Sequence, residues 1–296
     1  GQIITDPADL SGPKRVGGDT GHIDHCLWPF GQGAVQGGRV VGFHPDDADA
    51  VAKPCRRPAD KTAAAHGDQD RVGGKPLIVW HLEKLAAIGI HDVVINTSWL
   101  ANRFPETLGD GSQFGMLLEY AYEGSTPLET GGGMWHALPL LGRERISEEP
   151  FIAINGDIWT DYDFANLPRE PKGDAHLVMV DNPDHNASGD FTLLRSGHLL
   201  SVAPHPDDVA EADDAGMCLT FAGIGVYRPS LFDDWRRIIG DVPGVRDRQP
   251  SFRLAPLLRA AMSCSAVTGE YHAGRWTDVG TPERLESLNE LIALNE

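Results

Sequence analysis

Short apolar runs alternate with stripes of helical spacing along most of this chain. Runs typical of buried strands occupy residues 92–96, 116–120, 151–154, 175–180 and 218–227. Helical spacing predicts helices over 77–89, 99–108, 229–239, 253–262 and 283–294, and another that follows the glycines at 131–133 and ends at 141. A hairpin is predicted between 190 and 203, with its turn near Gly197. This alternation is typical of an α/β fold whose mostly parallel sheet is covered by helices on both faces.

Residues 1–71 lack this alternation. The segment mixes glycine, aspartate, histidine and proline, and within it only residues 39–43 (Arg-Val-Val-Gly-Phe) have the pattern of a strand. Such a composition predicts a disordered or poorly packed segment. We therefore expect an atypical leader over 1–71 and one folded domain over 72–296.

The charge balance argues against two classes of main partner. The chain has 43 acidic and 25 basic residues and a net charge of −18, which argues against nucleic acid or an anionic membrane as the main partner. A protein with this net charge can still bind phosphate ligands if a metal ion, helix N-termini or a few suitably placed cationic side chains contact them. The four cysteines form no CxxC pair, and we find neither a signal-peptide pattern nor an apolar stretch of membrane-spanning length. These features predict a cytoplasmic protein.

Two aspartates far apart in the sequence each follow a strand-like run. Asp157 follows Phe-Ile-Ala-Ile-Asn-Gly, and Asp278 follows Gly-Arg-Trp-Thr and precedes a glycine turn and a helix. Ligands of open α/β sheets bind at the carboxyl ends of strands. One such aspartate is usually a turn or cap residue, but two carboxylates suit a divalent cation that also binds substrate phosphates. The pair therefore favours a metal site.

Other polar residues near predicted strand and helix ends are weaker candidates. Glu129 and Thr130 precede the glycines at 131–133, which allow close approach of a ligand to a helix N-terminus or simply form a turn. The triplet matches neither the P-loop nor the dinucleotide-binding fingerprint. Asn155 either orients a ligand or satisfies its own turn, and Arg253 either binds an anion or is solvated.

The remaining acidic candidates are better explained as turn residues. Asp161 and Asp163 are predicted to cap a helix that starts near Phe164. Gly189 and Asp190 form either a substrate loop or, slightly preferred, an ordinary turn before a strand. No Ser-His-Asp or Cys-His relay is evident in the sequence, so a hydrolase with a covalent intermediate is poorly supported.

Taken together, residues 73–296 resemble the sugar-1-phosphate nucleotidyltransferases, and among them the bacterial enzymes that transfer uridylyl groups to N-acetylmuramate 1-phosphate. The matching motifs are residues 72–78 (Val-Gly-Gly-Lys-Pro-Leu-Ile), 110–115, 128–133, 155–164, 181–183 with 189–191, and 276–281. The resemblance covers about three quarters of the chain, and the motifs stand in the family's order. The resemblance implies a Rossmann-like αβα sandwich with a mixed, mostly parallel sheet.

The resemblance also implies a reaction and a set of roles. A sugar 1-phosphate, such as N-acetylmuramate 1-phosphate, attacks a nucleoside triphosphate, such as UTP, and pyrophosphate leaves; peptidoglycan recycling and nucleotide-sugar synthesis use such products. Asp157 and Asp278 would be catalytic and hold Mg²⁺. The implied nucleotide-binding residues are Glu129, Thr130, Gly131, Gly132 and Asn155. The implied sugar-phosphate-binding residues are Asn182, Gly189, Asp190, Gly223 and Arg253.

Three alternatives stay open. The first is guanylyl transfer to a mannose-type sugar phosphate, and the second is a catalytically dead protein that binds nucleotides or sugar phosphates. The third is a metal-dependent glycosyltransferase of related architecture, which would consume a nucleotide sugar.

The first 72 residues depart from the family. Its members open with a strand and a glycine-rich loop, Leu-Ala-Ala-Gly-x-Gly-x-Arg, followed by Pro-Lys-Pro, and neither motif occurs here. We therefore expect a domain that lacks its central strand and glycine-rich loop, with reduced catalysis and impaired folding. Our hypothesis is that the leader arises from a shifted reading frame or a misassigned start, and a genuinely degenerate protein is the alternative.

Overall fold

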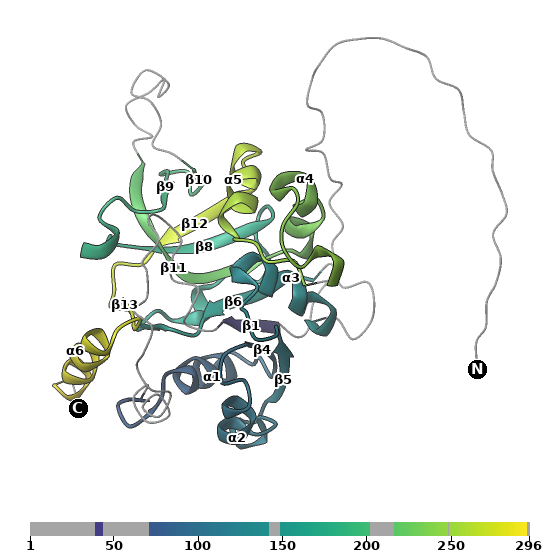
Figure 1. Ribbon diagram of the computed structural model, residues 1–296. Coiled ribbons are helices and arrows are strands. Elements are labelled where there is room, and N and C mark those ends of the chain that lie inside the picture. The colour runs from purple at the N-terminus through teal and green to yellow at the C-terminus, as the bar shows by residue number, and fades with distance from the viewer. Residues whose placement is uncertain (1–38, 44–70, 142–148, 202–215, 248, 295–296) are drawn as a thin grey trace, which may run out of the picture. The chain divides into compact units, whose positions relative to one another are not determined.

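A computed structural model describes residues 39–43, 71–141, 149–201, 216–247 and 249–294 (Figure 1). All of them lie in one folded unit, Ala34–Glu296, while the other unit, Gly1–Gly33, falls outside the described residues. The predicted leader, apart from residues 39–43 and Arg71, therefore also lies outside them. Within the described part of the chain, no helix is both long enough and apolar enough to cross a bilayer.

Nine of the described strands form one mixed sheet with the order β10-β9-β11-β6-β1-β4-β5, in which β8 pairs with β11 and β12 pairs with β8. The strands are β1 (Arg39–Phe43), β4 (Asp92–Thr97), β5 (Leu117–Tyr122), β6 (Phe151–Asn155), β8 (Ala175–Val180), β9 (Phe191–Leu193), β10 (Leu199–Leu200), β11 (Met217–Tyr227) and β12 (Val267–Tyr271). Two small ladders stand apart: β2 (Arg71–Val72) with β3 (Lys75–Pro76), and β7 (Ile158–Thr160) with β13 (Trp276–Asp278).

Helices and short 3-10 turns connect these strands. The α-helices are α1 (Leu77–Ala87), α2 (Arg103–Leu108), α3 (Glu129–Leu141), α4 (Trp235–Ile239), α5 (Ala255–Ser263) and α6 (Pro282–Ala293). The 3-10 turns are η2 (Ser112–Phe114), η3 (Phe164–Asn166), η4 (Asp184–Asn186), η5 (Pro229–Phe232) and η6 (Val245–Asp247).

Strand β1 occupies the centre of the parallel part of the sheet. It pairs in parallel with β4, where Val40 lies opposite Val93, and with β6, where Val40 lies opposite Ile152. The expectation that the central strand is missing is therefore wrong. Residues 39–43, the one strand-like run of the leader, supply it.

The other part of the sheet is largely antiparallel. Strand β11 runs antiparallel to β6, β8 and β9, whereas β12 runs parallel to β8. Within the described sheet, four pairings are parallel and four are antiparallel, which is more evenly mixed than the sequence predicted. The hairpin of β9 and β10 is confirmed, whereas the sequence analysis missed β12.

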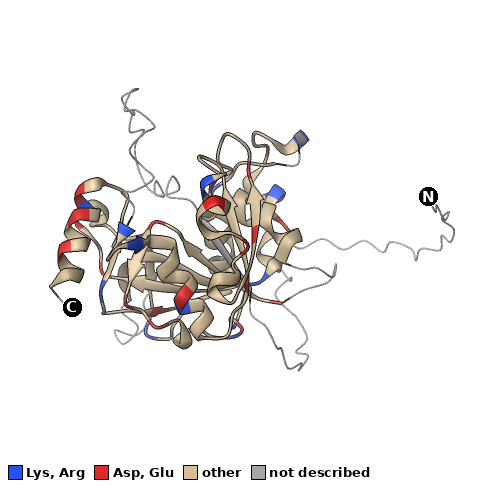
Figure 2. Cartoon of the chain, turned by 90° about the horizontal axis from the view of Figure 1, so that it is seen from below, with Lys and Arg blue, Asp and Glu red and all other residues tan. Residues whose placement is uncertain are grey.

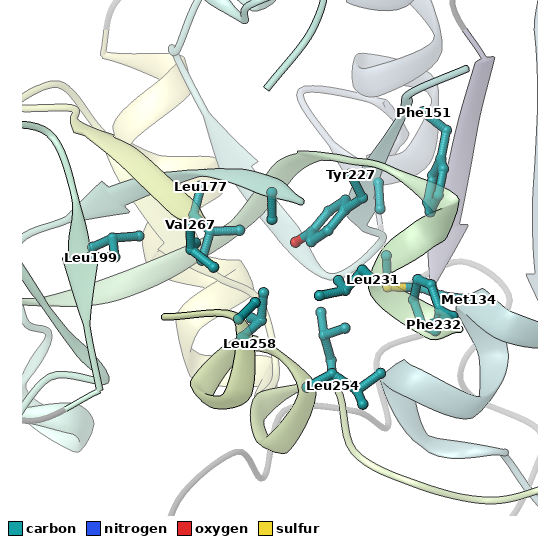
Figure 3. Close-up of a cluster of buried hydrophobic side chains, with 14 of the residues drawn as sticks. Met134, Phe151, Leu177, Leu199, Tyr227, Leu231, Phe232, Leu254, Leu258 and Val267 are labelled. Atoms are coloured by element: carbon teal, nitrogen blue, oxygen red, sulfur yellow. The ribbon is translucent and has the colours of Figure 1, made fainter. Parts of the chain in front are cut away.

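Side chains alternate between the two faces of the sheet. In β6, Phe151 and Ala153 join a hydrophobic cluster with residues of α3, α4 and α5, while Ile152 and Ile154 join a second cluster with residues of α1. Figure 3 shows part of the first cluster, where Tyr227 lies among aliphatic side chains. The helices thus cover both faces, which confirms the predicted α/β architecture (Figure 1).

Two predicted helices are shorter than expected. The helix expected over 99–108 is confined to α2, because Leu100 adopts a left-handed conformation with φ of 53°. The helix expected over 229–239 is divided into η5 and α4 at Asp233 and Asp234. Adjacent aspartates compete with helical hydrogen bonds and favour helix ends.

Candidate active site

The small ladder of β7 and β13 brings the two candidate metal ligands together. Asp278 lies opposite Ile158 in this ladder, and the N–H of Val279 donates to the carbonyl of Asp157 at 2.6 Å. Asp157 is 6% exposed, and the side chain of Asp278 is 13% exposed. Two mostly buried carboxylate residues thus become neighbours at the carboxyl end of β6, where ligands of α/β sheets bind.

Asp278 already has two nitrogen partners in the protein. A guanidinium N–H of Arg284 donates to its Oδ1, and Nε2 of His185 lies 3.3 Å from its Oδ2. The same Nη1 atom of Arg284 lies 3.3 Å from Nε2 of His185. The three side chains therefore form one cluster that joins β13, α6 and η4. The sequence analysis missed both partners of Asp278.

The N-terminus of α6 positions Arg284. Thr281 caps this helix by accepting a hydrogen bond from the N–H of Arg284 at 3.3 Å. Arg284 is the single basic residue of α6, which carries three glutamates along its exposed side (Figure 2). The signal in the sequence is the cap motif Thr-Pro-Glu-Arg, which places an arginine one turn into the helix after Asp278.

The glycines at the start of α3 approach another part of the protein closely. A Cβ atom on Gly132 would lie 2.2 Å from the carbonyl oxygen of Pro250. The N–H of Gly132 donates to the carbonyl of Phe252 at 2.9 Å, and the N–H of Phe252 donates to the carbonyl of Leu128 at 3.1 Å. Contact with the segment 250–253 therefore requires glycine here, whether or not a ligand also approaches.

A buried glutamate lies beside the same glycines and was missed from the sequence. Glu123 follows β5 and is 7% exposed; it accepts hydrogen bonds from Nδ2 of Asn96 at 2.6 Å and from the N–H of Leu128 at 2.9 Å. Burial raises the pKa of this carboxyl, and the two hydrogen bonds offset part of the effect. A Cβ atom on Gly133 would lie 2.5 Å from its Oε1. Glu123 thus fixes the approach of α3 to the ends of β4 and β5.

Glu129 and Arg253 lie side by side, although the resemblance placed them in different pockets. Nε of Arg253 is 3.6 Å from Oε2 of Glu129. Glu129 also has a φ of 62°, a left-handed conformation that costs a non-glycine residue about 1 kcal/mol or more. The structure therefore associates Arg253 with the start of α3 on the predicted nucleotide side, where Thr130 follows Glu129.

The predicted sugar-side residues Asn182 and Asp190 bind the protein itself. Nδ2 of Asn182 donates to the carbonyl of Cys218 at 3.0 Å, and its Oδ1 accepts from Thr220 at 2.9 Å. Asp190 accepts from the N–H of Phe221 at 2.8 Å and from Asn186 at 3.0 Å. These bonds fix the turn that contains Gly189 against β11. The turn interpretation preferred from the sequence for Gly189 and Asp190 is compatible with the bonds of Asp190.

Gly223, a predicted sugar-phosphate-binding residue, lies close to Asp157, a predicted metal ligand. It has a φ of 75° and lies where the pairing of β11 with β8 is interrupted. A Cβ atom on Gly223 would lie 2.9 Å from side-chain atoms of Asn155, at the end of β6. Trp276 of β13 donates to the carbonyl of Ala222 at 2.9 Å and holds the ladder against this bulge. Gly223 and Asn155 are therefore in contact close to Asp157.

Of the two aspartates predicted as caps, one has that role. Asp163 caps η3 by accepting from the N–H of Ala165 at 3.0 Å. Asp161 instead accepts from the N–H of Arg275 at 2.8 Å and lies 2.8 Å from Nε2 of His272. Burial opposes ionisation of Asp161, but the hydrogen bonds from His272 and Arg275 outweigh it and lower the pKa of this carboxyl.

Comparison with known proteins gives the family. A family model described as Nucleotidyl transferase matches residues 62–202. The N-acetylmuramate alpha-1-phosphate uridylyltransferase of Neisseria meningitidis serogroup B is 40% identical over 227 residues, which cover 74% of this chain and 86% of that protein. The chain belongs to the sugar-1-phosphate nucleotidyltransferase family.

Other similar proteins carry the names of different sugar-1-phosphate nucleotidyltransferases. The mannose-1-phosphate guanylyltransferase of Mycobacterium tuberculosis is 28% identical over 71% of this chain, which spans about half (54%) of that relative's length. A solved structure of a putative glucose-1-phosphate thymidylyltransferase from Bacillus anthracis matches with a TM-score of 0.58 and 18% identity, covering 86% of this chain and 94% of that one. At this identity the structural match establishes the fold alone.

Two neighbouring carboxylates are a donor set of the kind that Mg²⁺ uses in proteins. In the described part of the nucleotidyltransferase, no group of three or more His, Cys, Asp or Glu side chains is arranged to hold a metal. Mg²⁺ commonly binds through one or two carboxylates and completes its coordination with water and substrate phosphates. Asp157 and Asp278 fit that pattern.

Proposed function

We propose that this chain transfers a uridylyl group from UTP to N-acetylmuramate 1-phosphate and releases pyrophosphate, as a step of peptidoglycan recycling. The observation that carries the proposal is the juxtaposition of Asp157 and Asp278 at the carboxyl end of β6. The 40% identity to the N. meningitidis uridylyltransferase supports the choice of substrates.

The reaction is a single displacement. A phosphate oxygen of the sugar 1-phosphate forms a bond to the α-phosphorus of UTP, while the bond from that phosphorus to the oxygen bridging to the β-phosphate breaks. The electron pair leaves with pyrophosphate. Such a reaction needs alignment and charge neutralisation more than covalent catalysis by the protein. The absence of a nucleophile–histidine relay from the sequence agrees with this requirement.

Asp157 and Asp278 would hold Mg²⁺, which when bound neutralises phosphate charge and orients the triphosphate. The donor set fits because two neighbouring, mostly buried carboxylates are oxygen ligands of the kind that Mg²⁺ takes from a protein. The chain's own contribution is to fix both aspartates through the ladder of β7 and β13. Asn155 and Gly223 contact each other beside Asp157.

A substrate matrix tests this function. The purified full-length chain is incubated with Mg²⁺ and each combination of UTP, GTP or dTTP with N-acetylmuramate 1-phosphate, mannose 1-phosphate or glucose 1-phosphate. Pyrophosphate release is measured enzymatically, and the nucleotide sugar is identified by chromatography. We expect the highest kcat/KM with UTP and N-acetylmuramate 1-phosphate. A preference for GTP and mannose 1-phosphate would instead establish the guanylyltransferase alternative.

Substitution of the two aspartates tests the site. We expect Asp157→Asn and Asp278→Asn each to lower kcat by about a hundredfold or more, because each removes an anionic oxygen ligand of the cation that would neutralise the phosphates. Asp241→Asn, at an exposed position after α4, is the matched control and should retain wild-type activity. Activity in Asp157→Asn equal to that of the control would exclude the proposed site.

The pyrophosphate-release assay, combined with calorimetry, decides between an enzyme and a binding protein. Calorimetric binding of UTP without pyrophosphate release in any combination would refute transfer and support the binding alternative. A wild-type kcat of about 1–1000 s⁻¹, ordinary for enzymes, would contradict the reduced catalysis predicted from the missing glycine-rich loop.

A further inference from the structure

Both carboxylate oxygens of Asp278 are engaged by nitrogen groups from other elements. Arg284 of α6 donates to Oδ1, and His185 of η4 lies 3.3 Å from Oδ2. Arg284 and His185 are also within 3.3 Å of each other. Asp278 is the more buried member of its ion pair, with 13% of its side chain exposed against 32% for Arg284. The guanidinium therefore reaches inward from the surface to neutralise a mostly buried charge.

This arrangement conflicts with cation binding at the same carboxylate. A guanidinium keeps its charge at every pH that a protein tolerates. A divalent cation on Asp278 would lie within a few ångströms of that charge, and the two would repel each other. Either the cation binds weakly, or the guanidinium leaves Oδ1 when the cation arrives.

We propose that Arg284 is the internal counter-ion of Asp278 in the free protein and moves to a substrate phosphate when a divalent cation takes over Asp278. The proposal rests on the proposed transfer function, because that function supplies the phosphate. A guanidinium matches two phosphate oxygens with parallel N–H groups, so it is suited to the second role as well as the first. Its partial exposure leaves the side chain room to move, while the cap at Thr281 fixes its backbone.

The exchange makes a prediction that a purely structural role does not. If Arg284 only held Asp278 in place, its removal would disorder the carboxylate and weaken both cation binding and substrate binding. If Arg284 competes with the cation and then receives the phosphate, its removal strengthens cation binding and weakens substrate binding. The two measurements therefore change in opposite directions.

The test uses the full-length chain and the variant Arg284→Met, which keeps most of the aliphatic stem. Mn²⁺ is titrated calorimetrically into the substrate-free protein, and KM is measured for UTP and for N-acetylmuramate 1-phosphate. We expect the Kd for Mn²⁺ to fall on the order of tenfold, since a full charge is removed beside a divalent ion. We expect KM for at least one of the two substrates to rise on the order of tenfold.

Three further variants complete the comparison. Arg284→Lys retains the positive charge, so its Kd for Mn²⁺ should stay close to the wild-type value. Arg284→Gln, which also removes the charge, replaces the methionine variant if that variant does not fold. Arg237→Met is the matched control, because it breaks an exposed Arg–Asp pair of 2.6 Å on α4 and should change neither quantity.

Unchanged or weaker Mn²⁺ binding in Arg284→Met, with Arg284→Lys behaving like wild type, would overturn the proposal. Tighter Mn²⁺ binding with unchanged KM for both substrates would also overturn it, because the phosphate half of the exchange would be absent. If wild-type protein shows no transfer in any substrate combination, the proposed function fails separately. Calorimetric affinities for UTP and for N-acetylmuramate 1-phosphate then replace KM in the same comparison.

Discussion

His81 links the stability of this protein to pH. It lies on α1 at 5% exposure, with Nε2 2.9 Å from the carbonyl oxygen of Ile158, and among the described residues its Nδ1 has no hydrogen-bond partner. Burial lowers the pKa of His81 from 6.5 to about 4; the Ile158 carbonyl opposes this shift, and the nearby charge of Lys84 adds to it. The folded protein therefore keeps His81 neutral at pH values where the unfolded chain takes up a proton.

The size of the effect follows from that pKa difference. Stability from this group is fully present above pH 6.5, declines as the pH falls, and is completely lost below about pH 4. At about 1.4 kcal/mol for each pKa unit, the loss over this window amounts to about 3 kcal/mol. That is a large share of the roughly 5–15 kcal/mol by which a folded protein is usually stable.

Urea unfolding of His81→Gln between pH 7 and pH 4 measures this contribution. The glutamine amide can donate to the Ile158 carbonyl but does not titrate, so the variant should lose about 3 kcal/mol less than wild type over this range. His91→Gln, which replaces an exposed histidine, is the control and should follow the wild-type profile. Parallel profiles for wild type and His81→Gln would refute the assignment of acid sensitivity to His81.

Two further predictions concern the segments around the site. Gly132→Ala places a Cβ atom against the Pro250 carbonyl and should lower the free energy of unfolding by about 3 kcal/mol in urea titrations. Gly74→Ala has open space and only a left-handed φ of 77°, so it should cost about 1 kcal/mol, and an equal cost at both positions would contradict the packing argument. Thr281→Ala removes the cap of α6 and should cost about 1 kcal/mol by the same assay. Thr281→Ser retains a capping hydroxyl, and a loss as large as that of alanine would show that the cap is not responsible.

The sequence predicted the strand ends better than the contacts between them. The apolar run of β6 and the aspartate that follows it are visible in the pattern, so Asp157 was found directly. Its proximity to Asp278 depends on the ladder of β7 and β13, whose strands contain three residues each. Strands this short have too few positions to show an alternation. The second aspartate was therefore found by its local similarity to the first.

Local composition misled the analysis at β1. The run at residues 39–43 has strand character, but its surroundings lack any periodic pattern, so it was assigned to the leader. Its place between β4 and β6 is fixed by parallel pairing with strands that follow it by about fifty and a hundred residues in the sequence. Non-local pairing of this kind is not encoded in a short window of residues. The glycine triplet of α3 shows the same limit, because its packing partner, the segment 250–253, is equally remote.

The charge balance indicates which kinds of group would complete the proposed site, although it does not identify a residue. A chain of net charge −18 that binds phosphates needs a metal ion, helix N-termini or a few placed cations. Arg284 is such a cation, the single basic residue of a helix that otherwise carries acidic charge, and it is bonded to the carboxylate that would also bind the metal. One carboxylate thus has two candidate counter-ions. A guanidinium and a divalent cation repel each other at this distance. Comparing the Kd for Mn²⁺ of the free wild-type protein with that of Arg284→Met therefore shows whether Arg284 competes with the cation for Asp278.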